Sequence, residues 1–165
     1  MTITANQLLF VLSGGAANSD VNASLGGPKS NTTLSDNVIN NLFDDTSAAE
    51  AASGDQEYRG LFLMNTSTET LSNVMLSISV NTPAAGDSIY FTTDTIGTTT
   101  ANTMSTVSNE STAPTAIGTW TTGILSLGTF GPTKSWGVWV MKSTTAAAAS
   151  QANNTATFVF SGETA

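Results

Sequence analysis

Carboxylates are the main reactive groups of this chain, because its sequence contains no histidine and no cysteine. Histidine general bases, thiolate nucleophiles, disulfides and thiolate metal sites are therefore excluded. Asp44, Asp45, Asp55 and Glu57 form an acidic cluster. Two carboxylates facing each other across a cleft could hydrolyse glycosides, and several carboxylates with loop carbonyls could hold Ca²⁺. The cluster lacks EF-hand spacing and also fits a solvated loop, so we predict a non-enzymatic protein without metal or cofactor.

Arginine and tryptophan offer two further kinds of contact. Arg59 is the only arginine, and we expect it to form an ion pair that fixes its strand to the acidic loop. Trp120, Trp136 and Trp139 could form a platform for sugar rings. Trp136 and Trp139 are three positions apart, so they point to opposite faces of a strand. We expect one of them in the core and the other against a partner or a covering segment.

Charged residues are scarce: they make up 10% of the chain, against about 25% in an ordinary soluble domain. The net charge is -8, and the four basic residues are too scattered to form a basic stripe. Nucleic acid and anionic membrane surfaces are therefore poor partners. The surface must be built from neutral polar residues, which suits a protein that is packed into an assembly.

The spacing of apolar residues predicts an all-β fold. Leu71–Val80 alternates between apolar and polar residues, the pattern of a half-buried strand. Further strands are predicted at Tyr58–Asn65, Ser88–Thr92, Trp120–Leu127, Ser135–Lys142 and Thr155–Ser161. A turn is predicted at residues 83–86, and residues 94–118 form a long polar connection. Short strands with turn signals between them favour an antiparallel sandwich.

The first part of the chain has a different composition. Residues 8–12 could form a strand or a docking segment, but this apolar run is too short for a signal peptide or a membrane span. We therefore expect synthesis in a cytoplasm without export. Residues 13–33 are rich in glycine, asparagine and serine, which predicts a loop or extended arm. Residues 34–43 predict a short helix or an irregular packed turn. We divide the chain into an N-terminal arm with a packed loop region, 1–54, and a sandwich, 55–165.

Two predicted strands are apolar on both faces, although a strand of a two-sheet sandwich needs only one apolar face. The second face carries Phe62 and Met64 on one strand and Trp139 and Met141 on the other. The first 54 residues or a neighbouring subunit must cover it, because uncovered apolar patches mark interaction sites. The predicted partner-binding residues are Leu8, Phe10, Leu12, Phe62, Met64, Trp139 and Met141.

Two pairs of segments resemble immunoglobulin-like β-sandwich domains of the adhesion and virion type. The first pair is Tyr58–Asn65 with Leu71–Ile78, and the second is Leu127–Ser135 running into Trp136–Met141. The late turn reads Gly131-Pro132, where those domains have Pro-Gly. The resemblance implies an immunoglobulin-like antiparallel β-sandwich with an extended N-terminal arm.

Asn40–Asp45, followed by Gly54–Arg59, is similar to small virion proteins encoded among the structural genes of tailed phages. Together the resemblances cover roughly residues 34–162. They imply a capsid decoration or cement protein that binds the major capsid protein on the virion surface as a homotrimer. The alternative functions are a carbohydrate-binding or adhesion domain of a tail or fibre, and a glycosidase-like enzyme that uses the acidic cluster.

Overall fold

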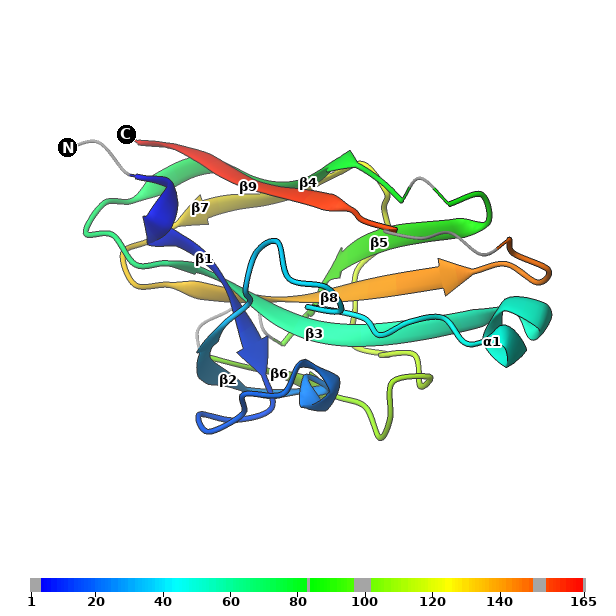
Figure 1. Cartoon of the computed structure of the whole chain (residues 1–165). Coiled ribbons are helices and arrows are strands. Elements are labelled where there is room, and N and C mark those ends of the chain that lie inside the picture. Colours follow the sequence, from blue (N-terminus) through cyan, green and yellow to red (C-terminus); the bar gives the residue numbers. More distant parts are fainter. Residues whose placement is uncertain (1–3, 83, 97–101, 150–153, 165) are drawn as a thin grey trace.

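The computed structural model of the chain describes residues 4–82, 84–96, 102–149 and 154–164. These residues form two antiparallel sheets that pack face to face (Figure 1). The prediction of an all-β sandwich is therefore confirmed. Pro83 of a predicted turn and residues 97–101 of the predicted connection lie outside the described residues.

The larger sheet has six strands in the order β5-β8-β3-β1-β2-β6, and all of its neighbouring strands are antiparallel. Its strands are β1 (Leu8–Ser13), β2 (Gly26–Thr33), β3 (Asp55–Asn65), β5 (Asp87–Thr93), β6 (Thr103–Thr106) and β8 (Ser135–Thr144). The smaller sheet has the order β7-β4-β9 and consists of β4 (Leu71–Val80), β7 (Ile124–Phe130) and β9 (Thr157–Thr164). The helical segments of the described residues are η1 (Ala5–Gln7), η2 (Val21–Ala23) and α1 (Ala48–Ser53).

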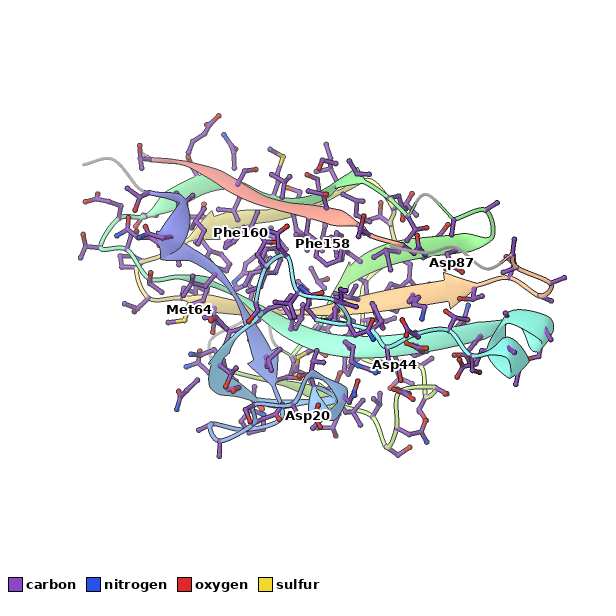
Figure 2. The ribbon with its side chains drawn as sticks, in the orientation of Figure 1. Asp20, Asp44, Met64, Asp87, Phe158 and Phe160 are labelled. Atoms are coloured by element: carbon purple, nitrogen blue, oxygen red, sulfur yellow. The ribbon has the colours of Figure 1, made fainter. Side chains whose placement is uncertain are left out.

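The main core lies between the two sheets. Because side chains alternate along a strand, β3 and β4 each bury one row in this layer, with Leu61 and Leu76 among the fully buried residues. Phe158 and Phe160 extend from β9 into the same layer (Figure 2). Phe158 meets the ring of Phe91 edge-on, with 4.8 Å between the ring centroids. Edge-on aromatic pairs of this kind stabilise the contact beyond the area they bury.

A second apolar layer lies on the opposite face of the six-stranded sheet. Phe62 of β3 and Trp139 of β8 are fully buried there. Met104 of β6 is buried against them. Three further side chains from the segment after β6 pack on this layer: Val107, Ile117 and Trp120. The chain itself therefore covers the face that the sequence predicts to need an arm or a neighbouring subunit, and most of the cover comes from the predicted long connection.

Much of the segment predicted to be a loop or extended arm is sheet instead. β1 pairs with β3 on one side and with β2 on the other, which joins residues on both sides of the predicted division at residue 54. β2 was missed because its sequence is polar and begins with two glycines. Gly26 has a φ of +89°, and a Cβ there would lie 1.8 Å from the carbonyl oxygen of Ser105. Only glycine lets β2 approach β6 this closely.

Between β2 and α1 the chain is irregular, so the alternative of a packed turn at residues 34–43 is confirmed and the short helix there is wrong. Leu42 is buried in the main core and fixes this segment. The helix comes later, at α1. Its first turn is capped by Ser47 and Glu50, whose side chains each accept a hydrogen bond from the other residue's backbone N–H.

Two predicted boundaries differ from the structure. The strand predicted at residues 120–127 is β7 and begins at Ile124, because Thr121 instead forms an isolated bridge with Phe91 of the other sheet. The predicted connection at residues 94–118 contains β6, which pairs with β2. The sequence of β6 is short and mostly polar, so β6 is recognised as a strand only from its pairing with β2.

Candidate functional site

The structure encloses most of the side chains predicted to contact a partner. Four are buried: Leu12, Phe62, Trp139 and Met141. Three are half-buried against the two apolar layers: Leu8, Phe10 and Met64. A partner could reach the buried four only if the chain opened, so an accessible binding surface has to be sought elsewhere in the fold.

The tryptophans do not form a shared platform. Trp139 is fully buried, and its indole N–H donates to the Oδ2 atom of Asp94 over 2.9 Å. Trp136 packs on the main core and Trp139 on the second layer, so the prediction of opposite faces is confirmed. Trp120 is half-buried, with its ring centroid 5.8 Å from that of Tyr58. Trp139 therefore stabilises the fold and offers no surface to a sugar.

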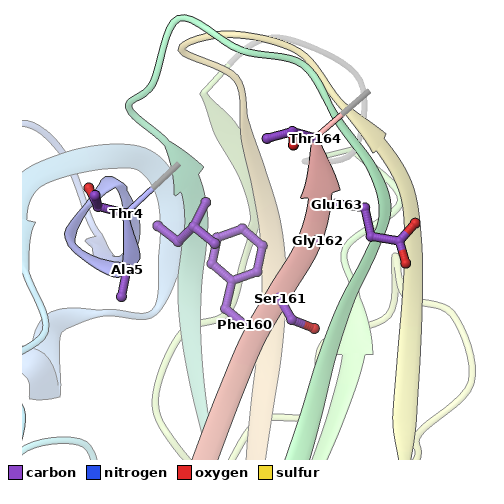
Figure 3. Close-up of a pocket in the computed structure, with 8 residues that line it drawn as sticks. Thr4, Ala5, Phe160, Ser161, Gly162, Glu163 and Thr164 are labelled. Atoms are coloured by element: carbon purple, nitrogen blue, oxygen red, sulfur yellow. The ribbon is translucent and has the colours of Figure 1, made fainter. Parts of the chain in front are cut away.

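A shallow hollow of about 480 Å³ lies between η1 and β9 (Figure 3). It is lined by Thr4, Ala5, Leu8, Phe160, Ser161, Gly162, Glu163 and Thr164. Glu163 is the only titratable side chain of this lining, and it accepts a hydrogen bond from the Asn73 amide over 2.8 Å. Acid–base catalysis of hydrolysis needs two groups in different roles, and this lining supplies one.

An acidic corner forms where α1 meets the beginning of β3. One carboxylate oxygen from each of Glu50, Asp55 and Glu57 lies within 4.8 Å of the others. Asp55 and Glu57 belong to the predicted acidic cluster and share a face of β3 because they are two positions apart. Glu50 was missed, although the pattern Ser47-x-x-Glu50 is a capping box that could have placed it in the first turn of a helix. Asp44 lies near the corner and raises the pKa of Glu57 through its charge.

Glu57 is the buried member of this corner and is only 4% exposed. Its Oε1 atom accepts a hydrogen bond from the Lys142 ammonium over 3.4 Å, on the neighbouring strand β8. Its Oε2 atom is buried without a hydrogen-bond partner among the described residues. Burial raises the pKa of Glu57 to about 7, and the Lys142 charge opposes this rise. One ammonium group is therefore too little to balance the buried carboxylate.

Arg59 pairs with a different partner from the one predicted. Its guanidinium donates to the Oε2 atom of Glu110 over 2.6 Å and to the Oδ1 atom of Asn22 over 3.0 Å. The backbone N–H of the neighbouring Tyr58 donates to the Glu110 carbonyl. Arg59 therefore fixes β3 to the segment after β6, and the expected ion pair with the acidic loop is wrong.

The outer face of the three-stranded sheet is an accessible surface that combines serines with exposed apolar side chains. Strand register places Ser126, Met75 and Ser161 in one row across this face and Ile124, Ser77 and Val159 in the next. We call these six residues the neutral face. Ile124 is 65% exposed, Val159 38% and Met75 36%. No other segment among the described residues is packed on it in Figure 1.

The neutral face carries no charge, although the chain as a whole carries -8. Glu163, at the end of β9, is the only charged residue in the three strands. Small hydroxyl groups alternate there with apolar side chains, so water can be displaced without leaving a charge unpaired. Chemically, this arrangement suits contact with another protein surface.

Comparisons of the chain with protein-family models, with curated proteins and with solved structures give no match. Among the described residues, no helix has both the length and the apolar character needed to cross a membrane.

Proposed function

We propose that the chain is a non-enzymatic structural protein that works by binding other protein subunits through the neutral face. The observation that carries this proposal is an uncharged, partly apolar sheet face on a strongly acidic chain. Interface cores are depleted of charged residues, and exposed apolar side chains that cluster mark interaction sites. The enclosed second layer leaves the neutral face as the partner surface that this fold supports best.

The setting we propose is the surface of a virion, where the chain decorates or cements the capsid by binding the major capsid protein. The support is the resemblance of Asn40–Asp45 and Gly54–Arg59 to small tailed-phage virion proteins, together with the low fraction of charged residues in the chain, 10%. Many identical contacts around a shell strengthen attachment through multivalency, even when each contact is modest. We also propose that the chain forms a symmetric trimer, which would increase the number of contacts that each attached particle of the protein makes with the shell.

The contact would be stabilised chiefly by burying apolar side chains. A specific interface buries about 1,600 Å² in total and uses about 20–30 residues of each partner, so residues around the six of the neutral face must contribute. Ile124 is the most exposed apolar residue of the face and lies in one of its two rows. A charge at this position would be buried without a partner, which strongly opposes association.

Mass spectrometry of purified particles tests the setting by giving the copy number of the chain. Hundreds of copies support a decoration or cement role. A dozen or fewer would move the protein to a neck, tail or fibre, and absence from particles would overturn the virion proposal.

A pair of variants tests the face itself. Ile124→Lys should reduce incorporation into particles at least tenfold, because it places a charge on the neutral face. Ile39→Lys makes the same change in a loop, at a residue that is 82% exposed, and should leave incorporation unchanged. Equal incorporation of the two variants would exclude the neutral face as the contact surface.

A further inference from the structure

The acidic corner carries an inference that does not depend on the proposed function. Three carboxylates from two elements converge there: Glu50 from α1, and Asp55 and Glu57 from the beginning of β3. Glu50 is held in place by the hydrogen bond that its Oε2 atom accepts from the Ser47 backbone N–H over 2.6 Å. The same bond lowers the pKa of Glu50.

An independent feature of the corner is the oxygen without a partner. The Oε2 atom of Glu57 is buried and accepts no hydrogen bond from the described residues, while its Oε1 atom is taken by Lys142. A buried carboxylate oxygen that lacks a donor costs free energy unless a cation or a proton compensates it. The charges that act on Glu57 include the carboxylates of Glu50, Asp55 and Asp44 on one side and the cations Lys142 and Arg59 on the other.

The positive groups near the corner are already engaged. Lys142 donates to the Asp44 carbonyl over 3.2 Å as well as to Glu57. Arg59, two positions along β3, forms its ion pair with Glu110. The centre of the Phe43 ring lies 5.5 Å from the Arg59 guanidinium and 5.9 Å from the Lys142 ammonium. The corner therefore retains an excess of negative charge.

The spacing of the carboxylates indicates which cation fits. Ca²⁺ binds oxygen ligands at about 2.3–2.6 Å, so two oxygens of one coordination shell lie at most about 5 Å apart. The three oxygens of the corner lie within 4.8 Å of one another, inside this limit. Mg²⁺ usually keeps several waters and takes only one or two carboxylates, so a set of three carboxylates favours Ca²⁺. Oxygen-only donors also disfavour softer transition metals.

We infer that Glu50, Asp55 and Glu57 form a Ca²⁺ site that ties α1 to the beginning of β3. The ion would give the free oxygen of Glu57 its missing partner. Water and backbone carbonyls would complete the six to eight ligands that Ca²⁺ takes. Its structural effect would be to hold the six-residue helix, which is too short to be stable alone, against the sheet.

Isothermal titration calorimetry of the full chain with CaCl₂, after treatment with a chelator, tests this inference. We expect one Ca²⁺ per chain. At a Ca²⁺ concentration of about 100 times Kd, the midpoint of thermal unfolding should rise by about 5–10 °C over its value in EDTA. Mg²⁺ should bind more weakly. Absence of saturable binding up to about 10 mM Ca²⁺, beyond the range of weak extracellular modules, would overturn the inference.

Variants locate the ion. Glu57→Gln and Asp55→Asn each keep the shape of the side chain, and each should abolish both the binding heat and the thermal shift. Asp36→Asn removes the same charge from an exposed loop and should retain both. Binding that persists in Glu57→Gln and Asp55→Asn would place the ion elsewhere and contradict the site. All of these readouts use the isolated chain, so they are independent of particle binding and of the neutral face.

Discussion

The outer faces of the two sheets differ in what lies on them. The six-stranded sheet carries Phe62 and Trp139 on its outer face, and the chain buries both beneath β6 and the segment that follows it. The three-stranded sheet carries serines with Met75, Ile124 and Val159 on its outer face, and these three apolar residues are exposed. Burial of the larger apolar groups completes the fold, whereas the smaller, uncharged set stays accessible.

This difference predicts opposite consequences of mutation on the two faces. Trp139→Ala removes a fully buried ring and leaves Asp94 without its indole donor. We expect it to lower the free energy of unfolding by about 3–5 kcal/mol. Ile124→Ala, on the neutral face, should change it by no more than about 0.5 kcal/mol. Urea denaturation of both variants measures this, and similar losses would erase the distinction between the faces.

A variant at Met104 tests whether β6 covers the outer face of the six-stranded sheet, because this side chain packs from β6 onto the second layer. Met104→Ala should lower the free energy of unfolding by about 2–3 kcal/mol, because the side chain is 4% exposed and leaves a cavity. Met75→Ala is the matched change on the neutral face and should have little effect. A stable Met104→Ala variant with unchanged thermal unfolding would mean that β6 does not cover this layer in solution.

The pH dependence of the free energy of unfolding should also come from the six-stranded sheet. The three strands of the smaller sheet hold only Glu163 as a titratable group. The pKa of Glu57 is raised from 4.5 to about 7, so the folded state favours its protonated form. Its contribution to stability is complete below pH 4.5 and is lost as the pH rises through 7. Each pKa unit of the shift corresponds to about 1.4 kcal/mol.

The measurement is urea unfolding of the native chain and of Glu57→Gln in EDTA, at several pH values between 4.5 and 8. Glutamine cannot ionise, so the stability of Glu57→Gln relative to the native chain should increase across this range. A difference that stays constant with pH would show that Glu57 does not titrate abnormally in the folded chain.

The sequence predicts the elements whose apolar pattern is strong. β3, β4 and β8 follow directly from alternation or from apolar residues on both faces, and the sandwich follows from these strands. β2 and β6 carry little apolar pattern. They are strands because each pairs with an edge that already exists, and a local pattern does not contain that information.

The candidate surface was not predicted from the sequence, because the neutral face shares no residue with the predicted partner-binding set. Phe62 and Trp139 indicate correctly that a second face needs cover, but sequence cannot tell whether the cover comes from the chain or from a partner. The alternation of β4 did contain the signal for the neutral face, since Ser77 and Ser79 mark its outward side. The convergence of Glu50 with Asp55 and Glu57 depends on how α1 folds back on β3, which no spacing rule gives.

Methionine oxidation, followed by mass spectrometry of the free chain and of assembled particles, tests the comparison of the two faces most directly. Oxidation depends on exposure, and each face carries methionine: Met75, 36% exposed, reports on the neutral face, and Met104, 4% exposed, reports on the second layer. We predict that Met75 is oxidised much faster than Met104 in the free chain and becomes protected in particles. Equal reactivity of Met75 in both states would contradict the neutral face as the surface that binds other subunits.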